Sequence, residues 1–472
     1  MKTQDNLILL SDAYKYSHHK LYYPGTSKMY SYLESRGGEF DETLFFGLQY
    51  FLKAYLAGKV ITKEKIDAAE KFMLQVFGRT DVFDRSKFDY ILEKYDGKLP
   101  VRIKAVPEGT AVPVSNVLMT IESTDEQCFW LPNFLETLLL QVWYPITVGT
   151  LSREIRKIVT EYFEETADDA AKGAIDFVLN DFGLRGVSSM ESAGLGGAAH
   201  LLNFLGSDNI PGSLLAQEFY GTEKVYGLSI PATEHSICTL LGEEGELEVF
   251  KHILRSFPTG TVACVSDSYD IFRACSEYWG GELKELVLSR QGTLVIRPDS
   301  GDPVFTLLRV FDILFDKFGY TVNSKGYKVL PSQVRVIQGD GINIQSIRAI
   351  YNALKVSGIS AENLVLGMGG ALLQKVDRDT QKFAFKCSYA VVNGEAVDVQ
   401  KNPTELNSHG ELVKSFKKSK AGRLKLVQEN GVYSTVREEE RPELADQLIT
   451  VFENGELKKN QHYDDIRRKA AL

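Results

Sequence analysis

The clearest hydrophobic pattern joins a strand-like segment to a helix-like segment in the second half of the chain. Residues 294–296 are apolar and lead into Arg297 and Asp299, which begin a turn rich in glycine, serine and proline. Apolar residues then recur at helical spacing over 304–318, with Pro303 at the first helical position. The pattern predicts a buried strand, a loop and an amphipathic helix. It places Arg297 and Asp299 at the carboxyl end of the strand, where α/β proteins bind their ligands.

The same order of strand, polar or glycine-rich loop and helix recurs along the middle of the chain. Five further apolar segments precede such a loop, the second of them with a weaker strand pattern: 175–180, 225–230, 262–265, 334–337 and 364–366. Apolar strands that alternate with helices predict an α/β fold with a parallel sheet covered by helices. So many units in succession favour a barrel-like closure over an open sheet.

Both ends of the chain have a different pattern, in which β character predominates. Three Asn-Gly pairs lie between strand-like runs and predict hairpins: 393–394, 430–431 and 454–455. Residues 99–122, near the start, also have a β pattern. We therefore expect a discontinuous mixed α/β domain with a mainly antiparallel sheet, built from residues 1–145 and 380–472, and an inserted barrel-like catalytic domain of residues 146–379.

Length and composition fit a globular protein of two domains. The 472 residues exceed one ordinary domain, and 44% are hydrophobic and 25% charged. The net charge of −9 argues against a general nucleic-acid-binding protein, although a local basic pocket for a phosphorylated small molecule remains compatible with it. The stretch 414–425 is locally basic, and either a solvated loop or a phosphate-facing loop explains its composition.

Cysteine usage and the first residues indicate the compartment. The five cysteines are scattered and contain no CxxC pair, which is typical of free thiols in a reducing compartment. Near the start, the apolar run 7–10 is too short for the core of a signal peptide, and no later segment approaches a membrane span. We expect a cytoplasmic protein without a membrane partner.

Polar side chains at the predicted strand ends suggest an anionic ligand that contains ribose. Asp267, Asp299 and Asp340 each follow a predicted strand. Singly, each is more typical of a helix cap, but three equivalent positions favour a site for ribose hydroxyls or for Mg²⁺ bound to phosphate oxygens. Glycines in 339–341 and 367–370 let backbone N–H groups approach a phosphate. Arginines at this level are candidate phosphate donors: Arg185, Arg297 and, further on, Arg378.

Other features allow more than one interpretation. The glycine-rich stretch 194–199 superficially matches a dinucleotide-binding fingerprint, but no strand directly precedes it, so a small-residue helix packed tightly on its neighbours fits better. His235 follows a predicted strand beside Glu234, and a structural and a functional role are both open. The remaining histidines show no metal-ligand spacing, which argues against zinc. Phe182, close to Arg185, offers a flat face for a small aromatic ring.

Six motifs together resemble one known family. They lie, in chain order, at 11–15, 181–189, 231–236, 265–270, 296–301 and 336–341. The chain resembles the nicotinamide phosphoribosyltransferases, of the type II phosphoribosyltransferase family, over nearly its whole length. The resemblance implies that family's irregular parallel α/β barrel. It also implies transfer of the phosphoribosyl group of 5-phosphoribosyl 1-pyrophosphate to nicotinamide, which gives nicotinamide mononucleotide and pyrophosphate in NAD salvage.

The resemblance further implies how the base is bound. Phe182 is expected to stack on one face of the pyridine ring and Tyr14 of the partner subunit on the other, so that a homodimer shares its active sites. Asp208 is expected to accept the carboxamide N–H, and its charge would repel the carboxylate of nicotinate. Arg297 and Asp299 are expected to hold the ribose and the ring region.

Phosphate binding and catalysis also follow from the resemblance. The 5′-phosphate side is expected to be held by Gly339, Asp340, Gly369 and Gly370. The pyrophosphate is expected to be surrounded by Arg185 and His235, and by Arg36, Arg378 and Lys386 of the partner subunit. The expected catalytic residues are His235, Asp267, Arg297 and Asp299. Mg²⁺ is expected to bind mainly through the substrate phosphates, with Asp267 as a candidate ligand, and ATP to stimulate turnover by phosphorylating His235.

The chain departs from the family pattern at a few positions, and two alternatives stay open. Met368 and Ala371 interrupt the glycine run, and Ala384 stands where a serine is frequent, which affects single phosphate contacts. The first alternative is a nicotinate phosphoribosyltransferase, against which Asp208 argues. The second is a binding or signalling protein that kept the scaffold without catalysis, against which the intact acidic and basic residues argue.

Overall fold

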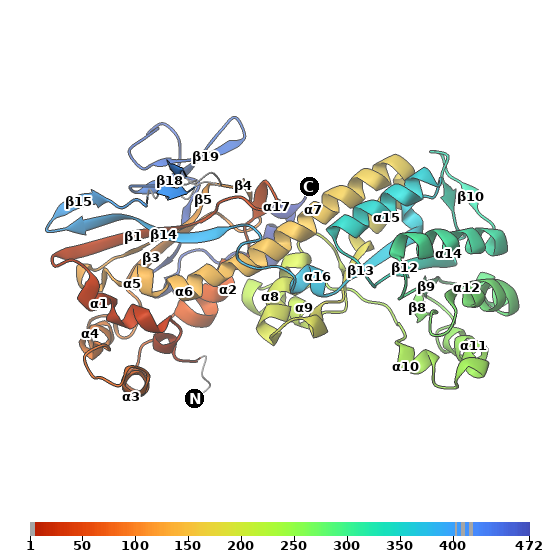
Figure 1. The fold of residues 1–472 in the computed structure, drawn as a ribbon, viewed down its shortest axis with the longest axis horizontal. Coiled ribbons are helices and arrows are strands. Elements are labelled where there is room, and N and C mark those ends of the chain that lie inside the picture. Colours follow the sequence, from red (N-terminus) through yellow and green to blue (C-terminus); the bar gives the residue numbers. More distant parts are fainter. Residues whose placement is uncertain (1–4, 402–403, 407–410, 415–418) are drawn as a thin grey trace. The chain divides into compact units, whose positions relative to one another are not determined.

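The computed structural model describes residues 5–401, 404–406, 411–414 and 419–472. The chain divides into two compact units, whose elements are labelled in Figure 1. The terminal unit comprises Met1–Thr147, Phe219–Gly221 and Asp377–Ala470. The barrel unit comprises Val148–Glu218, Thr222–Val376 and Ala471–Leu472.

The terminal unit contains a seven-stranded antiparallel sheet in the order β15-β14-β1-β5-β3-β20-β21. Its strands are β1 (Thr26–Ser35), β3 (Val101–Ala105), β5 (Val117–Ser123), β14 (Phe383–Val392), β15 (Glu395–Asp398), β20 (Ile449–Glu453) and β21 (Glu456–Leu457). Strand β1 pairs with β14 on one side and β5 on the other, and β3 pairs with β20. The antiparallel part is therefore built from both ends of the chain, which confirms the predicted fold class.

The predicted hairpins form at all three Asn-Gly pairs. The turns connect β14 to β15, β18 (Leu424–Glu429) to β19 (Val432–Arg437), and β20 to β21. The asparagines have φ of 51–52° and the glycines 81–82°, the left-handed conformation that two-residue type I′ turns require. Two smaller antiparallel pairs join β2 (Glu42–Leu44) to β4 (Ala111–Pro113) and β16 (Thr404–Leu406) to β17 (Leu412–Lys414).

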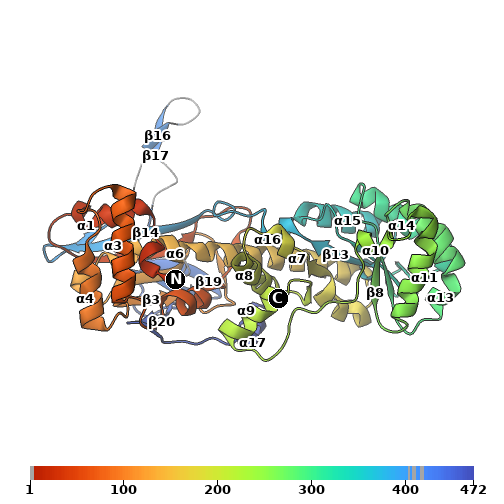
Figure 2. The ribbon, with the colours of Figure 1, turned by 90° about the horizontal axis from the view of Figure 1, so that it is seen from below.

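The terminal unit also contains helices. They are α1 (His18–Leu21), α2 (Leu48–Phe51), α3 (Lys63–Phe77), α4 (Arg85–Tyr95), α5 (Leu131–Phe134), α6 (Glu136–Leu139) and α17 (Tyr463–Ala470). Figures 1 and 2 show α1, α3 and α4 on one side of the sheet and the hairpin β18–β19 on the other. Both faces of the central strands are therefore buried, as the uninterrupted burial of β5 reflects.

The barrel unit contains a six-stranded parallel sheet in the order β7-β6-β13-β12-β9-β8. Its strands are β6 (Leu179–Asp181), β7 (Gly206–Ser207), β8 (Val262–Val265), β9 (Leu294–Arg297), β12 (Val334–Gln338) and β13 (Leu364–Met368). The strands predicted at 262–265, 294–297, 334–337 and 364–366 are confirmed. The strand predicted at 175–180 is displaced, because a 3₁₀-helix occupies Asp169–Phe177 and the pairing with β13 extends only over residues 179–181.

The weak strand predicted at 225–230 is not a regular strand, yet it closes the sheet. Leu228 forms an isolated parallel bridge with Gly206, next to β7, and Ala232 forms one with Ala263 in β8. Between them stands Pro231, which has no N–H to donate and therefore cannot continue a strand ladder. The segment 228–232 thus joins the two edges of the curled sheet into an irregular α/β barrel, as the predicted fold class requires.

The helices of the barrel unit follow its strands. They are α8 (Met190–His200), α10 (His235–Cys238), α11 (Glu246–Ser256), α12 (Ile271–Arg273), α13 (Lys284–Leu288), α14 (Pro303–Phe318), α15 (Ile344–Val356) and α16 (Gly370–Leu373), while α7 (Trp143–Thr166) and α9 (Ile210–Tyr220) run from one unit into the other. Helix α14 begins at Pro303, as predicted, and the side chain of Asp302 caps it by accepting a hydrogen bond from the N–H of Phe305 at 2.8 Å.

The glycine-rich stretch 194–199 lies within α8 and serves close packing. A Cβ atom on Gly197 would lie 2.9 Å from Cα of Gly212 in α9, so the two helix backbones touch. This confirms the interpretation of the stretch as a tightly packed small-residue helix rather than a dinucleotide-binding fingerprint. No helix within the described residues combines the length and the apolar character needed to cross a membrane.

Candidate active site

The carboxyl ends of the parallel strands in the barrel unit surround a cavity of about 800 Å³. A cavity of this size suits a small-molecule substrate. Nine of the residues predicted for the site line it: Phe182, Arg185, Asp208, His235, Arg297, Asp299, Gly339, Asp340 and Gly369. Asp267 reaches the cavity through its contact with His235, and Gly370 directly follows Gly369. Residues far apart in sequence therefore meet at the strand ends, as parallel barrels require.

Arg297 and Asp299 form an ion pair at the end of β9. Nε and Nη2 of Arg297 lie 3.1 and 2.8 Å from the same oxygen, Oδ1 of Asp299. A Cβ atom on Gly339 would lie 3.1 Å from Nη2 of Arg297 and 3.2 Å from that oxygen, so the glycine leaves the pair uncovered. Among the described residues Oδ2 of Asp299 has no hydrogen-bond partner. It is thus an acceptor available to ligand hydroxyl groups.

Phe182 follows β6 and lies against the same ion pair. Its ring centroid is 5.5 Å from the guanidinium carbon of Arg297, and its N–H donates to the carbonyl of Met368 at 3.0 Å. A Cβ atom on Gly367 would lie only 2.1 Å from Cε2 of the phenylalanine ring. Gly367 therefore leaves room for the Phe182 ring. The sequence predicts Gly367 only as part of a phosphate-binding run, because its contact with Phe182 depends on the pairing of β6 with β13.

Asp208 lies directly after β7, beside the end of β6. Its N–H donates to the carbonyl of Asp181 at 3.0 Å, and its Oδ1 accepts a hydrogen bond from the hydroxyl of Ser229. The buried Asp181 accepts hydrogen bonds from the N–H of Gly183 at 2.7 Å and the amide of Asn209 at 2.8 Å. Burial raises the pKa of Asp181 to about 6. Neither Asp181 nor Ser229 is predicted as a site residue: Asp181 belongs to a recognised motif, whereas no local pattern relates Ser229 to Asp208.

His235 is the first residue of α10 and contacts an aspartate from the end of β8. Its Nε2 lies 3.1 Å from Oδ1 of Asp267. The histidine side chain is 50% exposed, while that of Asp267 is 3% exposed. Next to it, the hydroxyl of Ser236 donates to Glu234. The imidazole is thus oriented by a buried carboxylate and stays accessible from the cavity, which favours the functional interpretation of this histidine.

The four residues expected from a partner subunit lie in the terminal unit. Tyr14, in a 3₁₀-turn at Ala13–Ser17, is 60% exposed. Arg36 follows β1 and donates from Nε to Glu34 at 2.7 Å. Burial lowers the pKa of Lys386, and the positive charges of Arg36 and Arg378 lower it further. Arg36, directly after β1, and Lys386, in the adjacent strand β14, therefore come from paired segments, and Arg36 is ion-paired with Glu34.

The predicted basic loop is only partly described. Lys420 pairs with the buried carboxylate of Glu34, and Arg423 lies 2.8 Å from Glu122 and 2.7 Å from Glu438. These two cations are therefore neutralised within the terminal unit. Lys417 and Lys418 lie outside the described residues, so their interpretation as a solvated or phosphate-facing loop stays open.

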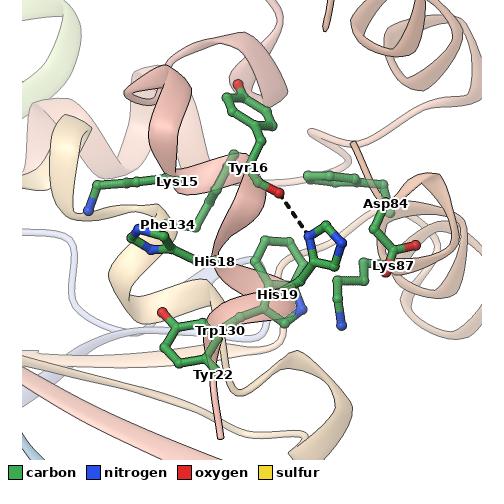
Figure 3. A pocket seen from close by; sticks show the side chains of 10 residues that line it. Lys15, Tyr16, His18, His19, Tyr22, Asp84, Lys87, Trp130 and Phe134 are labelled. Atoms are coloured by element: carbon green, nitrogen blue, oxygen red, sulfur yellow. Dashed lines mark hydrogen bonds between the residues drawn. The ribbon is translucent and has the colours of Figure 1, made fainter. Parts of the chain in front are cut away.

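A second, much smaller cavity of about 30 Å³ lies beside the Tyr14 turn in the terminal unit (Figure 3). Nδ1 of His19 lies 2.8 Å from the carbonyl of Tyr16, and Nζ of Lys15 lies 2.8 Å from Glu136. The ring of His18 is 5.1 Å from the ring of Tyr14. A space of this size is too small for a nucleotide, and its polar groups bind the turn that carries Tyr14.

Comparisons with known proteins identify the family of the chain. The profile of the family described as nicotinate phosphoribosyltransferase (NAPRTase) matches residues 177–456, and that of the nicotinamide phosphoribosyltransferase N-terminal domain matches residues 6–103. The nicotinamide phosphoribosyltransferase of Xanthomonas campestris pv. campestris is 48% identical, with 99% of this chain and 98% of that protein covered. The one from Acinetobacter baylyi is 32% identical, with 100% and 98% covered.

Two solved structures share the fold over nearly the whole chain. Nicotinate-nucleotide pyrophosphorylase from Pyrococcus furiosus has a TM-score of 0.60 and 15% identity, with 100% of this chain and 96% of that chain covered. Human nicotinic acid phosphoribosyltransferase has a TM-score of 0.55 and 18% identity, with 98% and 93% covered. The family profile matches more than half of the chain and the two relatives match it over nearly its whole length, so the chain belongs to the nicotinate phosphoribosyltransferase family and, within it, to the nicotinamide phosphoribosyltransferases.

Proposed function

We propose that the protein transfers the phosphoribosyl group of 5-phosphoribosyl 1-pyrophosphate to nicotinamide, giving nicotinamide mononucleotide and pyrophosphate in NAD salvage. One observation carries the proposal: an aromatic ring, Phe182, and a carboxylate, Asp208, line one cavity with the Arg297–Asp299 pair. An aromatic face, an acceptor for an amide N–H and a cation–carboxylate pair are the groups that a pyridine amide and a phosphorylated ribose require.

Asp208 is the group that selects the amide. A carboxylate accepts a hydrogen bond from the carboxamide NH₂ of nicotinamide, whereas it repels the carboxylate of nicotinate. The alternative, a nicotinate phosphoribosyltransferase, therefore fits this cavity less well. Asp208→Ala removes the like-charge repulsion, so the variant is expected to lose its preference for the amide.

The reaction proceeds by substitution at the anomeric carbon of the ribose. The lone pair of the pyridine nitrogen forms the new C–N bond while the C–O bond to pyrophosphate breaks, so no general base is needed. Arg297 and Asp299 hold the ribose, and Gly339, Asp340, Gly369 and Gly370 let the 5′-phosphate approach the backbone N–H groups. These contacts fix the sugar in the orientation from which the nitrogen attacks.

The departing pyrophosphate requires positive charge. Arg185 and His235 line the cavity on this chain, and Arg36, Arg378 and Lys386 of the partner subunit complete the cationic surroundings. The oxygen donors of Asp267 and Asp340 suit Mg²⁺, but no group of three His, Cys, Asp or Glu side chains in the described ranges is arranged to hold a metal. The ion would therefore be held mainly by the substrate phosphates, where it neutralises their charge, with Asp267 as a candidate ligand.

ATP is proposed to stimulate the reaction by phosphorylating His235. The Nε2 contact with Asp267 and the half-exposed ring support a phosphate acceptor rather than a proton shuttle. The protein is further proposed to act as a homodimer, because Tyr14 of the partner subunit would supply the second face of the pyridine stack. It is also proposed to act in the cytoplasm.

An assay of the purified protein tests the proposal. Nicotinamide, 5-phosphoribosyl 1-pyrophosphate and Mg²⁺ are incubated with it, and nicotinamide mononucleotide is quantified by chromatography. Formation of the mononucleotide supports the proposal. Tight substrate binding in calorimetry without turnover would instead support a binding or signalling protein on the same scaffold.

A further inference from the structure

The base-selecting carboxylate has one partner from outside its own loop. Oδ1 of Asp208 accepts a hydrogen bond from the hydroxyl of Ser229. Among the described residues no partner contacts Oδ2 of Asp208. One carboxylate oxygen is therefore occupied within the protein, and the other is available to a ligand.

Ser229 is held at this position by the closure of the barrel. The adjacent Leu228 forms two backbone hydrogen bonds, one on each side of Gly206. The carbonyl of Leu228 accepts from the N–H of Ser207 at 3.0 Å, and the N–H of Leu228 donates to the carbonyl of Leu205 at 2.8 Å. Asp208 directly follows Ser207, and Ser229 directly follows Leu228, so the two interacting side chains lie next to this pair of hydrogen bonds. The register of an isolated bridge thus fixes the distance between the serine and the aspartate.

Asp208 lies where two cavities of the barrel unit meet. It lines the active-site cavity of about 800 Å³ and a further cavity of about 380 Å³ inside the barrel, and Ser229 lines the latter. Both residues are exposed to these spaces rather than packed in the core. An unheld carboxylate at such a junction is free to rotate about its side-chain bonds, and only a fraction of its rotamers face a bound base.

We propose that Ser229 is a positioning residue for base selection, which holds Asp208 by its Oδ1 so that Oδ2 faces the carboxamide of nicotinamide. The inference rests on the proposed function. Ser229 does not touch the reacting atoms, so its loss weakens binding of the base more than the chemical step. A hydrogen bond to a charged group that orients one ligand contact corresponds to an effect of about tenfold in KM.

Steady-state kinetics of Ser229→Ala test the proposal. We expect the KM for nicotinamide to rise about tenfold, with kcat and the KM for 5-phosphoribosyl 1-pyrophosphate close to wild type. Ser229→Thr keeps the hydroxyl and should restore most of the affinity. Ser256→Ala, which removes an exposed hydroxyl bonded within α11, is the matched control and should leave all constants unchanged.

A double-mutant cycle separates positioning from a merely structural role. In an Asp208→Ala background, Ser229→Ala should cause no further change in the KM for nicotinamide, because the carboxylate that it positions is absent. The proposal would be overturned if Ser229→Ala raised the KM for nicotinamide equally in the wild-type and Asp208→Ala backgrounds. It would also be overturned if Ser229→Ala raised the KM values for both substrates and lowered the melting temperature. If the wild-type protein forms no mononucleotide, the proposed function fails. If it does and Ser229→Ala is silent, only the positioning role fails.

Discussion

Nε2 of His235 lies 3.1 Å from Oδ1 of Asp267, and the two residues differ sharply in exposure. The aspartate side chain is 3% exposed and the histidine side chain 50%. A buried carboxylate that contacts one ring nitrogen fixes the orientation of the imidazole. The other nitrogen, Nδ1, has no partner among the described residues. This arrangement suits a histidine that is modified by a ligand in the cavity.

The first prediction concerns ATP. His235→Ala should abolish the stimulation of turnover by ATP and the incorporation of labelled phosphate, while basal activity remains. Asp267→Ala should reduce both effects, because the ring loses the group that orients it. Initial rates with and without ATP, together with labelling by γ-³²P-ATP, measure the change.

A matched control is available on the neighbouring helix. His252 is an exposed histidine in α11, and His252→Ala should respond to ATP like the wild type. If His235→Ala loses basal activity as well, with its fold intact by circular dichroism, then His235 acts directly in the transfer step rather than as a phosphate acceptor.

The second prediction tests the contact between Gly367 and Phe182. Gly367→Ala places a methyl group against the ring, which must move, so the KM for nicotinamide should rise about tenfold and the melting temperature should fall, as overpacking costs about 1–3 kcal/mol. Gly173→Ala in the same unit meets no atom within 4 Å and is the control. An unchanged KM in Gly367→Ala would show that the position of the Phe182 ring does not matter for base binding.

The third prediction tests whether active sites are shared between subunits. Tyr14→Ala and Arg297→Ala should each be nearly inactive alone. In a co-expressed mixture, half of the dimers carry both changes on opposite chains and keep one intact site, so about a quarter of wild-type activity should return. Activity no higher than the sum of the separate variants would contradict sites completed by a partner subunit.

The fourth prediction concerns stability and pH. Glu108 is buried, and its two oxygens accept hydrogen bonds from the N–H groups of Gly47 at 3.1 Å and Gln49 at 2.7 Å. Burial raises the pKa of Glu108 from its ordinary value of 4.5 to about 7. Between these values the folded state binds more protons at Glu108 than the unfolded state, so the contribution of Glu108 to the free energy of unfolding should fall as the pH rises, and level off above about 7.

The Gln variant isolates this contribution. Glu108→Gln cannot ionise, so the difference in free energy of unfolding between wild type and variant should decrease with pH by up to about 3 kcal/mol, since one pKa unit corresponds to about 1.4 kcal/mol. Urea unfolding at several pH values between about 4.5 and 7 measures the difference. Parallel curves for the two proteins would exclude a raised pKa at this position.

Local patterns predict much of this fold because local physics decides it. The strand and helix around Arg297 follow from apolar periodicity, a proline at the first helical position and an aspartate cap. The three hairpins follow from Asn-Gly pairs, because few other pairs adopt positive φ at both turn positions at low cost. Most of the cavity residues could be predicted for a similar reason, since the carboxyl ends of parallel strands must converge. Asp208 is expected only from the resemblance to the family.

Relationships between distant segments could not be predicted in this way. Ser229 reaches Asp208 only because an irregular segment with Pro231 bridges the two edges of the sheet. Gly367 has to be small because of Phe182, which follows a different strand. The strand expected at 175–180 is shortened because its partner β13 pairs with only three residues. Each case depends on register between segments, which no local pattern contains.

Asp208 is proposed to make this protein a transferase for the amide. The most direct measurement compares kcat/KM for nicotinamide and nicotinate, with 5-phosphoribosyl 1-pyrophosphate and Mg²⁺ held saturating. We predict a preference for nicotinamide of at least about a hundredfold, because the acid leaves a like charge against Asp208 and loses a hydrogen-bond donor. Equal or greater kcat/KM for nicotinate would show that Asp208 does not select the amide.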